Sequence, residues 1–396
     1  MKIGYFVPEF PSQTHAFFWR EAEAMQRAGA SIRFLSSRQP SRDACPHSFA
    51  EVARARTHYV YPPRYGAALS ALARAPRRAA AAARYVAKLT ETPWSRRARL
   101  LGLILCASDL VEKCRREGVG HVHFHSCADA AHIGALAAIL GDIHYSLTLH
   151  GDLPVYGVDH AAKMRRAALL TAVTRPLATQ IREATGRKAL VIWMGVDVAS
   201  FRPPDRPKRL DGGMHAVSIA RLNWVKGHRF FLAAMARAVS EGLDMRYTIA
   251  GDGPYAETLA REVAEHGLAD RVTFLGAVGQ DRVRALLEEA DVFALTSIGQ
   301  GEAAPVAVME AMACGLPVIC SRIGGTPDMI TDDVDGLLCD QEDVDGILEA
   351  LRRLAREDGL AARLSSAARR RAEAAFDHRA NAARLLRAIE ATTTPA

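Results

Sequence analysis

Two carboxylates near the start of an expected helix are the strongest chemical signal in the sequence. Glu302 follows the glycines Gly299 and Gly301, and Glu310 lies about two helical turns further on, in a helix whose first turn contains Pro305. Free N–H groups and the helix dipole favour an anion at such a helix end, whereas carboxylates accept hydrogen bonds from hydroxyls. The arrangement therefore suits a ligand that carries both phosphate and sugar groups. The alternative is a pair of solvent-exposed acids, which are common in first turns.

Short apolar runs alternate with amphipathic helical stretches along the chain, a pattern typical of parallel βαβ units. In the amino-terminal part we expect strands over 3–7, 31–36, 121–125, 145–149, 170–173 and 190–193. Helices are expected there over 15–28 and within the Ala/Arg-rich stretch 62–116. In the carboxy-terminal part we expect strands over 216–220, 245–250, 272–275, 292–296 and 317–321. Helices are expected over 227–241, 256–266, 280–290, 306–314 and 326–330, with a helical tail over 343–391.

The segment 201–213 interrupts this alternation with three prolines, two glycines and six charged residues. We interpret it as a linker between two doubly wound halves, 1–200 and 214–373. Such halves usually hold a ligand in the cleft between them, at the carboxyl ends of their strands.

Composition and charge narrow the class of protein. The chain has 396 residues, 49% hydrophobic and 24% charged, which excludes disorder, collagen and coiled coil and predicts two or three globular domains. The net charge of +7 is concentrated in residues 62–99, where nine basic side chains face only Glu91. A solvated helical face and contact with an anionic membrane surface both remain open for this stretch. A nucleic-acid partner is not expected, because no base-stacking or groove-reading motif accompanies the charge.

Cysteine usage and hydropathy bear on location. The seven cysteines form no Cys-x-x-Cys pair, which favours a reducing compartment. Pro8 and Glu9 interrupt the first apolar stretch before it could serve as a signal-peptide core, and the apolar run 133–141 is far shorter than the ~20 residues of a membrane span. We expect a cytoplasmic protein and leave open a peripheral position at the inner face of the membrane.

The segment containing Glu302 and Glu310 resembles the E-x7-E signature of retaining GT-B enzymes in glycosyltransferase family 4. Ala-Met-Ala-Cys-Gly-Leu-Pro-Val follows it, and Gly324-Gly325 and the Asp-Gly-Leu-Leu turn at 335–338 also match. Two further blocks agree with that family, SIARLNWVKGHRFFLAA at 218–234 and YTIAGDGP at 247–254. The resemblance covers most of the carboxy-terminal half and, more loosely, the other half.

The resemblance implies an α/β GT-B fold, in which two Rossmann-like doubly wound domains face a central cleft and a helix at about 374–396 returns to the first domain. It implies that Glu310 accepts a hydrogen bond from the nucleotide ribose and Glu302 from a donor-sugar hydroxyl. Arg221 and Lys226 would neutralise the departing diphosphate, a role that fixed positive charge can fill without a metal. A solvated surface role is the alternative for these two cations. The implied donor-binding residues are Arg221, Lys226, Gly251, Glu302, Ala303, Ala304, Pro305, Val306 and Glu310.

The amino-terminal half contributes one candidate catalytic residue and one loop. His150-Gly151-Asp152 follows an expected strand and resembles the His-Gly element that places His150 near the donor anomeric carbon; a buried structural histidine is the alternative. The resemblance thus gives the catalytic set His150, Arg221, Lys226 and Glu302. EFPSQTHAFFWREAEAM at 9–25 resembles a segment of exopolysaccharide and colanic-acid enzymes, although Thr14-His15-Ala16 replaces the usual Ser-Glu-Thr. The expected acceptor-side residues are Ser12, Gln13, Thr14 and His15.

The strand His-Val-His-Phe-His-Ser places His121, His123 and His125 on one face, which would suit a metal. No carboxylate or cysteine lies at ligand spacing, and the similar strand of the family binds no catalytic metal. We therefore expect hydrogen bonding at the strand end, no essential metal and no cofactor, the nucleotide sugar being a substrate.

The sequence thus predicts a retaining glycosyltransferase that moves a hexosyl or amino-hexosyl group from a UDP- or GDP-linked sugar to a hydroxyl. Expected acceptors are a glycan or a lipid-linked oligosaccharide in exopolysaccharide or cell-surface glycan synthesis. Retention is implied by the resemblance alone. No Asp or Glu is placed as a covalent nucleophile, and the resemblance favours attack on the same face of the sugar, assisted by the leaving phosphate. The alternatives are a transferase for a soluble natural product, a GT-B epimerase or phosphorylase, and a non-catalytic assembly protein.

Overall fold

The computed structural model describes residues 1–204, 213–299 and 302–393. The chain divides into two compact units, one of Met1–Trp193 with Arg379–Ala396 and one of Met194–His378. The division falls earlier than residue 200 because the chain after Trp193 is bound to the second unit. There Val196 pairs with Asp377, and Arg369 donates hydrogen bonds to the carbonyls of Val198 (3.0 Å) and Phe201 (2.8 Å). Most of the expected linker 201–213 lies outside the described residues.

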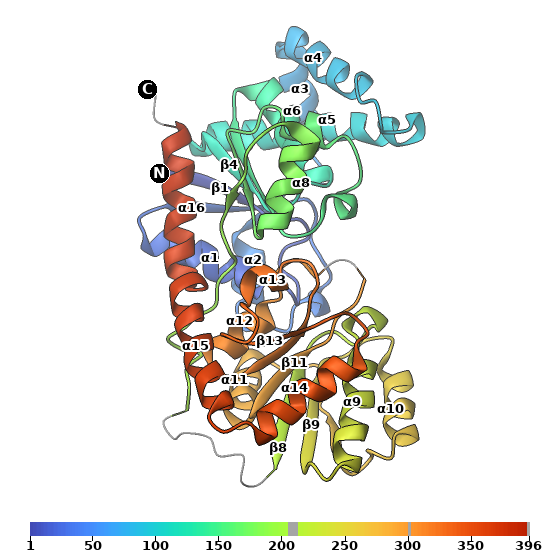
Figure 1. Ribbon diagram of the computed structural model, residues 1–396. Helices are drawn as coiled ribbons and strands as arrows, with labels where there is room; N and C mark the ends of the chain where they lie inside the picture. Colours follow the sequence, from blue (N-terminus) through green and yellow to red (C-terminus); the bar gives the residue numbers. More distant parts are fainter. Residues whose placement is uncertain (205–212, 300–301, 394–396) are drawn as a thin grey trace. The chain divides into compact units, whose positions relative to one another are not determined.

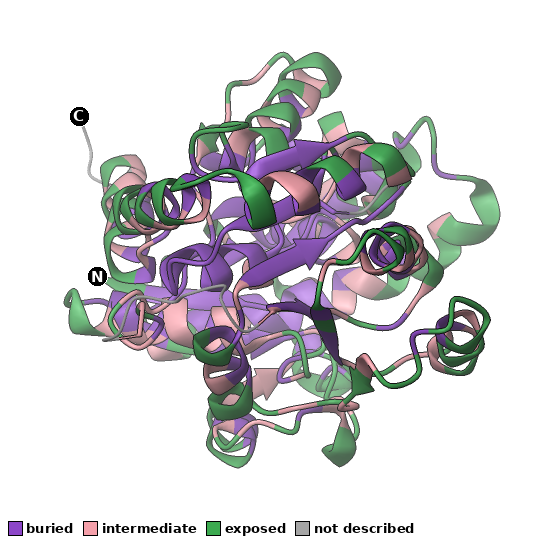
Figure 2. Ribbon diagram, turned by 60° about the horizontal axis from the view of Figure 1, so that its bottom comes forward, coloured by how far each residue is buried: buried purple, intermediate pink, exposed green. Residues whose placement is uncertain are grey.

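The first unit contains a seven-stranded parallel sheet in the order β3-β2-β1-β4-β5-β6-β7. Its strands are β1 (Lys2–Phe6), β2 (Ser31–Ser36), β3 (Thr57–Tyr59), β4 (His121–Phe124), β5 (His144–Leu149), β6 (Leu169–Ala172) and β7 (Leu190–Val191). Its helices are α1 (Ala16–Arg27), α2 (Ala50–Arg56), α3 (Tyr65–Arg74), α4 (Pro76–Ala87), α5 (Trp94–Glu117), α6 (Asp129–Gly141), α7 (His160–Met164) and α8 (Arg175–Thr185). The strands are mostly buried, whereas the helices expose their outer faces (Figure 2).

The C-terminal helix α16 (His378–Thr393) completes the core of the first unit. Leu385 and Ile389 of this helix are buried with Ile3 and Tyr5 of β1 and with Met25 of α1. Residues from opposite ends of the chain therefore share one hydrophobic core, which accounts for the assignment of the chain from Arg379 onward to this unit.

The second unit contains a six-stranded parallel sheet in the order β10-β9-β8-β11-β12-β13. Its strands are β8 (Met214–Ile219), β9 (Met245–Ala250), β10 (Val272–Phe274), β11 (Val292–Leu295), β12 (Val318–Ser321) and β13 (Leu337–Cys339). Its helices are α9 (His228–Ser240), α10 (Ala256–Glu265), α11 (Gln280–Glu289), α12 (Val306–Ala313), α13 (Thr326–Met329), α14 (Val344–Arg356) and α15 (Leu360–Ala375).

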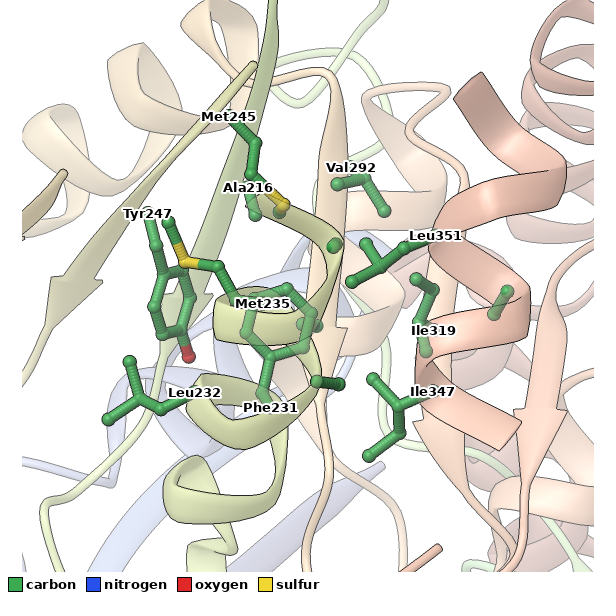
Figure 3. Packing of buried hydrophobic residues seen from close by; sticks show 14 of the residues in the cluster. Ala216, Phe231, Leu232, Met235, Met245, Tyr247, Val292, Ile319, Ile347 and Leu351 are labelled. Atoms are coloured by element: carbon green, nitrogen blue, oxygen red, sulfur yellow. The ribbon is translucent and has the colours of Figure 1, made fainter. Parts of the chain in front are cut away.

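Side chains from two helices fill one face of this second sheet (Figure 3). Phe231 and Met235 of α9 and Leu351 of α14 belong to one buried cluster with strand residues such as Tyr247 and Ile319, and the ring centroids of Phe231 and Tyr247 lie 4.6 Å apart. This core fixes the strand ends, where the candidate site lies.

The two sheets share one topology, and the predicted pair of doubly wound halves is confirmed. In each sheet the first strand lies between the second and the fourth, so the connections run to opposite sides of the first strand. The crevice at this switch point, outside the carboxyl ends of the strands, is where open α/β sheets bind ligands. It lies between β1 and β4 in the first unit and between β8 and β11 in the second.

The basic stretch 62–99 forms α3, α4 and the start of α5, which lie together at the top of Figure 1. Several of its arginines form ion pairs, among them Arg64 with the buried Asp109 at 2.6 Å and Arg78 with Asp142 at 2.5 Å. In the described parts of the chain, no helix has the length and apolarity needed to cross a bilayer.

Candidate active site

Lys226 and Glu302 meet at the switch point of the second sheet. Lys226 ends the short 3-10 turn Trp224–Lys226 that follows β8, and Glu302 lies in the loop after β11. The Lys226 ammonium donates a hydrogen bond to Glu302 Oε2, which also accepts one from Ser297 Oγ at 2.8 Å. The side chains of Lys226 and Glu302 remain 21% and 11% exposed, so the pair is accessible to a ligand.

Hydrogen bonds between the two loops hold this pair together. Thr296 Oγ1 donates to the carbonyl of Gly227 at 2.9 Å, and the N–H of Ile298 donates to the carbonyl of Val225 at 2.8 Å. Gly227 has a φ of +63°, and a Cβ there would lie 1.8 Å from the carbonyl oxygen of Thr296. Only glycine allows this approach, which places Lys226 beside Glu302.

A glycine pair after β12 positions the loop that contains Glu302. The N–H of Gly325 donates to the carbonyl of Ala303 at 2.8 Å, and a Cβ on Gly324 would lie 1.7 Å from the carbonyl oxygen of Glu302. Ala303 and Ala304 are both buried. The Gly324-Gly325 pair noted in the sequence therefore packs against the backbone of the loop that contains Glu302.

The loop continues into α12, which begins at Val306 after Pro305 at the N-cap position. A proline side chain cannot accept hydrogen bonds, so among the described residues no N-cap side chain binds the first N–H groups of this helix, and these groups can bind an anion. Glu310 lies further along α12 and is buried, with only 9% of its surface exposed.

Arg221 supplies a second cation at the same sheet edge. It follows β8, its side chain is exposed, and no acidic side chain of the described residues lies within ion-pair distance of it. Gly251 follows the neighbouring strand, where the N–H of Ala220 donates to the carbonyl of Ala250 at 3.1 Å. Every donor-side residue expected from the sequence thus lies in the loops at one edge of the second sheet or in α12.

His150 follows β5 in the first unit, and the rings of Phe17, Phe18 and His125 surround its side chain. Its ring centroid is 5.4 Å from that of Phe17 and 5.1 Å from that of Phe18, and its Nε2 is 3.1 Å from Nδ1 of His125. Its backbone N–H donates to the phenol oxygen of Tyr156 at 2.9 Å. Burial lowers the pKa of His150 to about 3, so the imidazole is neutral near pH 7.

The expected acceptor-side loop lies next to this ring cluster. Gln13 and Thr14 are exposed, and the N–H of His15 donates to the carbonyl of Ser12 at 3.0 Å. The His15 ring lies 5.1 Å from that of Phe18, which also contacts His150. Burial lowers the pKa of His15 to about 4, so this ring too is neutral near pH 7.

The histidines of β4 take part in hydrogen bonds. His121 Nε2 and His123 Nδ1 each lie 2.7 Å from Ser146 Oγ, and His123 Nε2 lies 2.8 Å from Thr148 Oγ1. Within the described ranges, no group of three or more histidine, cysteine or acidic side chains is arranged to hold a metal. The contacts are those of a buried hydrogen-bond network.

Sequence reasoning missed two contributors to these sites. Ser297 binds Glu302, but a serine after a strand carries no specific signal. Glu21 of α1 accepts a hydrogen bond from the Tyr5 hydroxyl at 2.7 Å and lies 3.4 Å from Nε2 of His125. Burial raises the pKa of Glu21 to about 7. The sequence did contain one signal for Glu21. Helical spacing places it on the same face of α1 as the apolar residues Phe18 and Met25, and an acid on a buried face usually has a partner.

The fold is that of the GT-B enzymes. The solved structure of Anabaena HepE in complex with UDP matches it with a TM-score of 0.75 at 17% identity, covering 99% of this chain and 100% of that one. The model of the family described as "Glycosyl transferases group 1" matches residues 206–371.

Two curated relatives support the same family. A GDP-mannose-dependent alpha-(1-6)-phosphatidylinositol monomannoside mannosyltransferase of Mycolicibacterium smegmatis is 30% identical over 67% of this chain and 74% of its own length. A putative colanic acid biosynthesis glycosyltransferase, WcaL of Escherichia coli K12, is 31% identical over 50% of each chain. This chain spans only 50% to 59% of the length of its two colanic acid relatives. The protein belongs to the group 1 glycosyl transferases.

Proposed function

We propose that the protein is a retaining glycosyltransferase that moves a hexosyl or amino-hexosyl group from a UDP- or GDP-linked sugar to a hydroxyl of a glycan or lipid-linked oligosaccharide. The observation that carries this proposal is the contact of Lys226 with Glu302 at the switch point of the second sheet. The names of the relatives support exopolysaccharide or cell-surface glycan synthesis as the setting.

The chemistry of the site suits the departure of a nucleoside diphosphate. Lys226 keeps two of its three N–H donors when it binds Glu302, and the exposed Arg221 adds a second cation. Together with the uncapped start of α12 they supply fixed positive charge where the leaving diphosphate develops negative charge, without a metal. Carboxylate oxygens such as those of Glu302 and Glu310 can accept hydrogen bonds from hydroxyls of the sugar and the ribose.

On the first unit, we propose that neutral His150 positions the donor sugar by hydrogen bonding. Its lowered pKa argues against imidazolium as an acid at neutral pH. With no carboxylate assigned as a nucleophile, attack on the same face of the sugar, assisted by the leaving phosphate, is the mechanism we propose for retention.

The first test is a thermal-shift panel of UDP, GDP and ADP, extended to their common sugar derivatives. We expect one nucleotide to raise the melting temperature and the matching sugar nucleotide to release nucleoside diphosphate only with an acceptor. Conversion of the donor into an isomeric sugar nucleotide without an acceptor would indicate an epimerase, and no stabilisation by any nucleotide would indicate a non-catalytic assembly protein. Proton NMR of the product's anomeric centre tests retention.

We also propose that the basic stretch 62–99 contacts an anionic membrane surface. Trp94 is 75% exposed and Leu69 is 56% exposed, and the exposed cations Arg84 and Lys88 lie in the same stretch. Basic residues near anionic lipid contribute about 1 kcal/mol each, so Arg84→Gln/Lys88→Gln should weaken vesicle binding about tenfold or more.

Sedimentation with anionic and zwitterionic vesicles at low salt tests this membrane contact. Arg246→Gln/Arg261→Gln removes two exposed cations from the second unit and serves as the matched control. Failure of the wild type to bind anionic vesicles would refute the membrane proposal.

A further inference from the structure

A cationic cavity in the first unit is lined by none of the residues expected to bind the donor. Its volume is about 200 Å³, and its wall includes Arg96, Arg99, Asp129, Tyr156 and Lys163. These residues come from α5, α6, the turn after β5, and α7, so the cavity is built from several elements of one unit.

A buried lysine forms part of the cavity wall. Lys163 is only 1% exposed, and its ammonium donates to the carbonyls of Cys127 at 2.8 Å and Tyr156 at 2.9 Å. An ammonium has three donors, and no carboxylate oxygen of the described residues lies within ion-pair distance of this one. Burial lowers the pKa of Lys163, the direction expected when a buried cation lacks a close anion. A buried charge of this kind is costly unless it is paired.

Two exposed arginines, Arg96 and Arg99, also line the cavity. Arg99 forms an ion pair with Asp129, whereas Arg96 has no acidic partner among the residues that the structure describes. The three cations therefore face a single carboxylate in the lining. His132 also lines the cavity, and burial lowers its pKa to about 4, so it adds no charge near pH 7.

The rim of the cavity is held in place by the buried carboxylate of Asp159. Asp159 accepts hydrogen bonds from the backbone N–H groups of Thr90 (3.1 Å), Glu91 (3.2 Å) and Thr92 (2.8 Å). Since Thr92 lines the cavity, these bonds fix its edge. They also satisfy the Asp159 carboxylate, which leaves the Lys163 ammonium without a direct acidic partner.

The cavity adjoins the turn that contains His150, and the Phe18 ring lies beside both His150 and His15 of the expected acceptor-side loop. Tyr156 lines the cavity, and its phenol oxygen accepts the backbone N–H of His150 at 2.9 Å. A group bound in the cavity would therefore lie against the turn that positions His150.

We propose that this cavity binds a phosphate or diphosphate group of the acceptor. The inference rests on the proposed function, since it assigns the acceptor an anionic group next to the hydroxyl that is glycosylated. Oxygen atoms of such a group can accept hydrogen bonds from the cationic N–H donors of Arg96, Arg99 and Lys163, and charge-assisted hydrogen bonds of this kind are the strong ones.

Calorimetric titration of inorganic diphosphate into protein already saturated with its nucleoside diphosphate tests the cavity. We expect saturable binding that Arg96→Gln weakens about tenfold. Arg182→Gln removes an exposed arginine of the first unit that does not line the cavity and should leave the affinity within about twofold.

A second variant acts in the opposite direction, which no folding defect would imitate. Asp129→Asn removes the carboxylate of the lining and should strengthen diphosphate binding about threefold or more. No saturable binding by the wild type, or affinities that both Arg96→Gln and Asp129→Asn leave unchanged, would overturn the proposal.

Geranyl diphosphate distinguishes the two sources of the anion. Tighter binding than inorganic diphosphate, with the same loss in Arg96→Gln, supports a lipid-linked acceptor group. Equal or weaker binding would overturn the acceptor assignment and leave a site for free phosphate. If no nucleoside diphosphate binds, the proposed function fails, and direct titration with inorganic diphosphate still tests the cavity through Arg96→Gln.

Discussion

Lys226 and Glu302 lie far apart in the sequence but form a hydrogen-bonded ion pair between the loops after β8 and β11. Ser297 donates to the same carboxylate oxygen, which fixes the orientation of Glu302. The pair presents an ammonium and a carboxylate side by side, and we propose that they bind phosphate and hydroxyl groups, respectively.

Lys226→Ala should lower turnover by about two to three orders of magnitude, because fixed cations at a leaving group contribute that much to catalysis. Glu302→Gln should also lower kcat, and the double variant should be less impaired than the product of the two single effects, since the residues act as a unit. The measurement is kcat for the double-mutant cycle with the donor found in the nucleotide panel. Multiplicative effects would show that the two side chains act separately.

Glu310→Gln should weaken donor binding about tenfold while the fold remains intact. The carboxylate is proposed to accept a hydrogen bond from the ribose, and charged hydrogen bonds of this kind contribute about 1.5–3 kcal/mol. Donor KM and far-ultraviolet circular dichroism check the two parts of this expectation. An unchanged KM would remove Glu310 from the donor site.

Gly324→Ala should lower both stability and turnover. Its φ is +53°, and a Cβ there would lie 1.7 Å from the carbonyl oxygen of Glu302, so the loop that contains Glu302 must shift at a cost of a few kcal/mol. Gly276→Ala is the matched control, because Gly276 has a φ of +66° and no heavy atom within 4 Å of the added Cβ. That control should cost only about 1 kcal/mol and keep its activity. Equal losses in the two variants would show that backbone strain, not the contact with Glu302, is responsible.

The pH dependence of stability should change in Glu21→Gln. The pKa of Glu21 is raised from 4.5 to about 7 in the folded state, so its contribution to stability falls as the pH rises from about 4.5 to 7. The buried His125 and His150, whose pKa values are lowered, have the opposite effect, because the folded state loses stability as the pH falls below 6.5. As the pH falls, the stability gained through Glu21 therefore partly offsets the stability lost through the two histidines.

Without that carboxylate, the variant should lose stability more steeply than the wild type between pH 7 and pH 5. Thermal unfolding at intervals across this range measures the difference, with Glu23→Gln on the same helix as the control. Parallel curves for wild type and Glu21→Gln would contradict the placement of Glu21 against the histidines.

Most strands and helices could be predicted from the sequence, because the spacing and length of the apolar runs determine them. Strands 31–36 and 245–250 agree with the structure to the residue, and most other expected elements differ by one or two residues at their ends. The strand at Leu337–Cys339 was interpreted as a turn, because three residues after Asp335-Gly336 are too few to show alternation. The helix Arg175–Thr185 was also missed, although Thr174 caps it by accepting a hydrogen bond from the N–H of Leu177.

Only those residues of the candidate site that belong to a recognisable sequence motif could be predicted. Glu302 and Lys226 were assigned from their motifs, but no spacing rule indicates that residues so far apart touch. Ser297 and Glu21 required the strand order and the register of α1 against β1 and β4, which are tertiary properties. The cavity around Lys163 is likewise assembled from four separate segments.

The central claim is that Lys226 and its neighbours bind the diphosphate of a nucleotide donor. Calorimetric titration of UDP and GDP into the wild type, Lys226→Ala and the exposed-lysine control Lys188→Ala tests it most directly. We predict that one of the two nucleotides binds the wild type and Lys188→Ala with equal affinity and binds Lys226→Ala at least about tenfold more weakly. Binding of neither nucleotide to the wild type, or equal affinity for Lys226→Ala, would contradict this account.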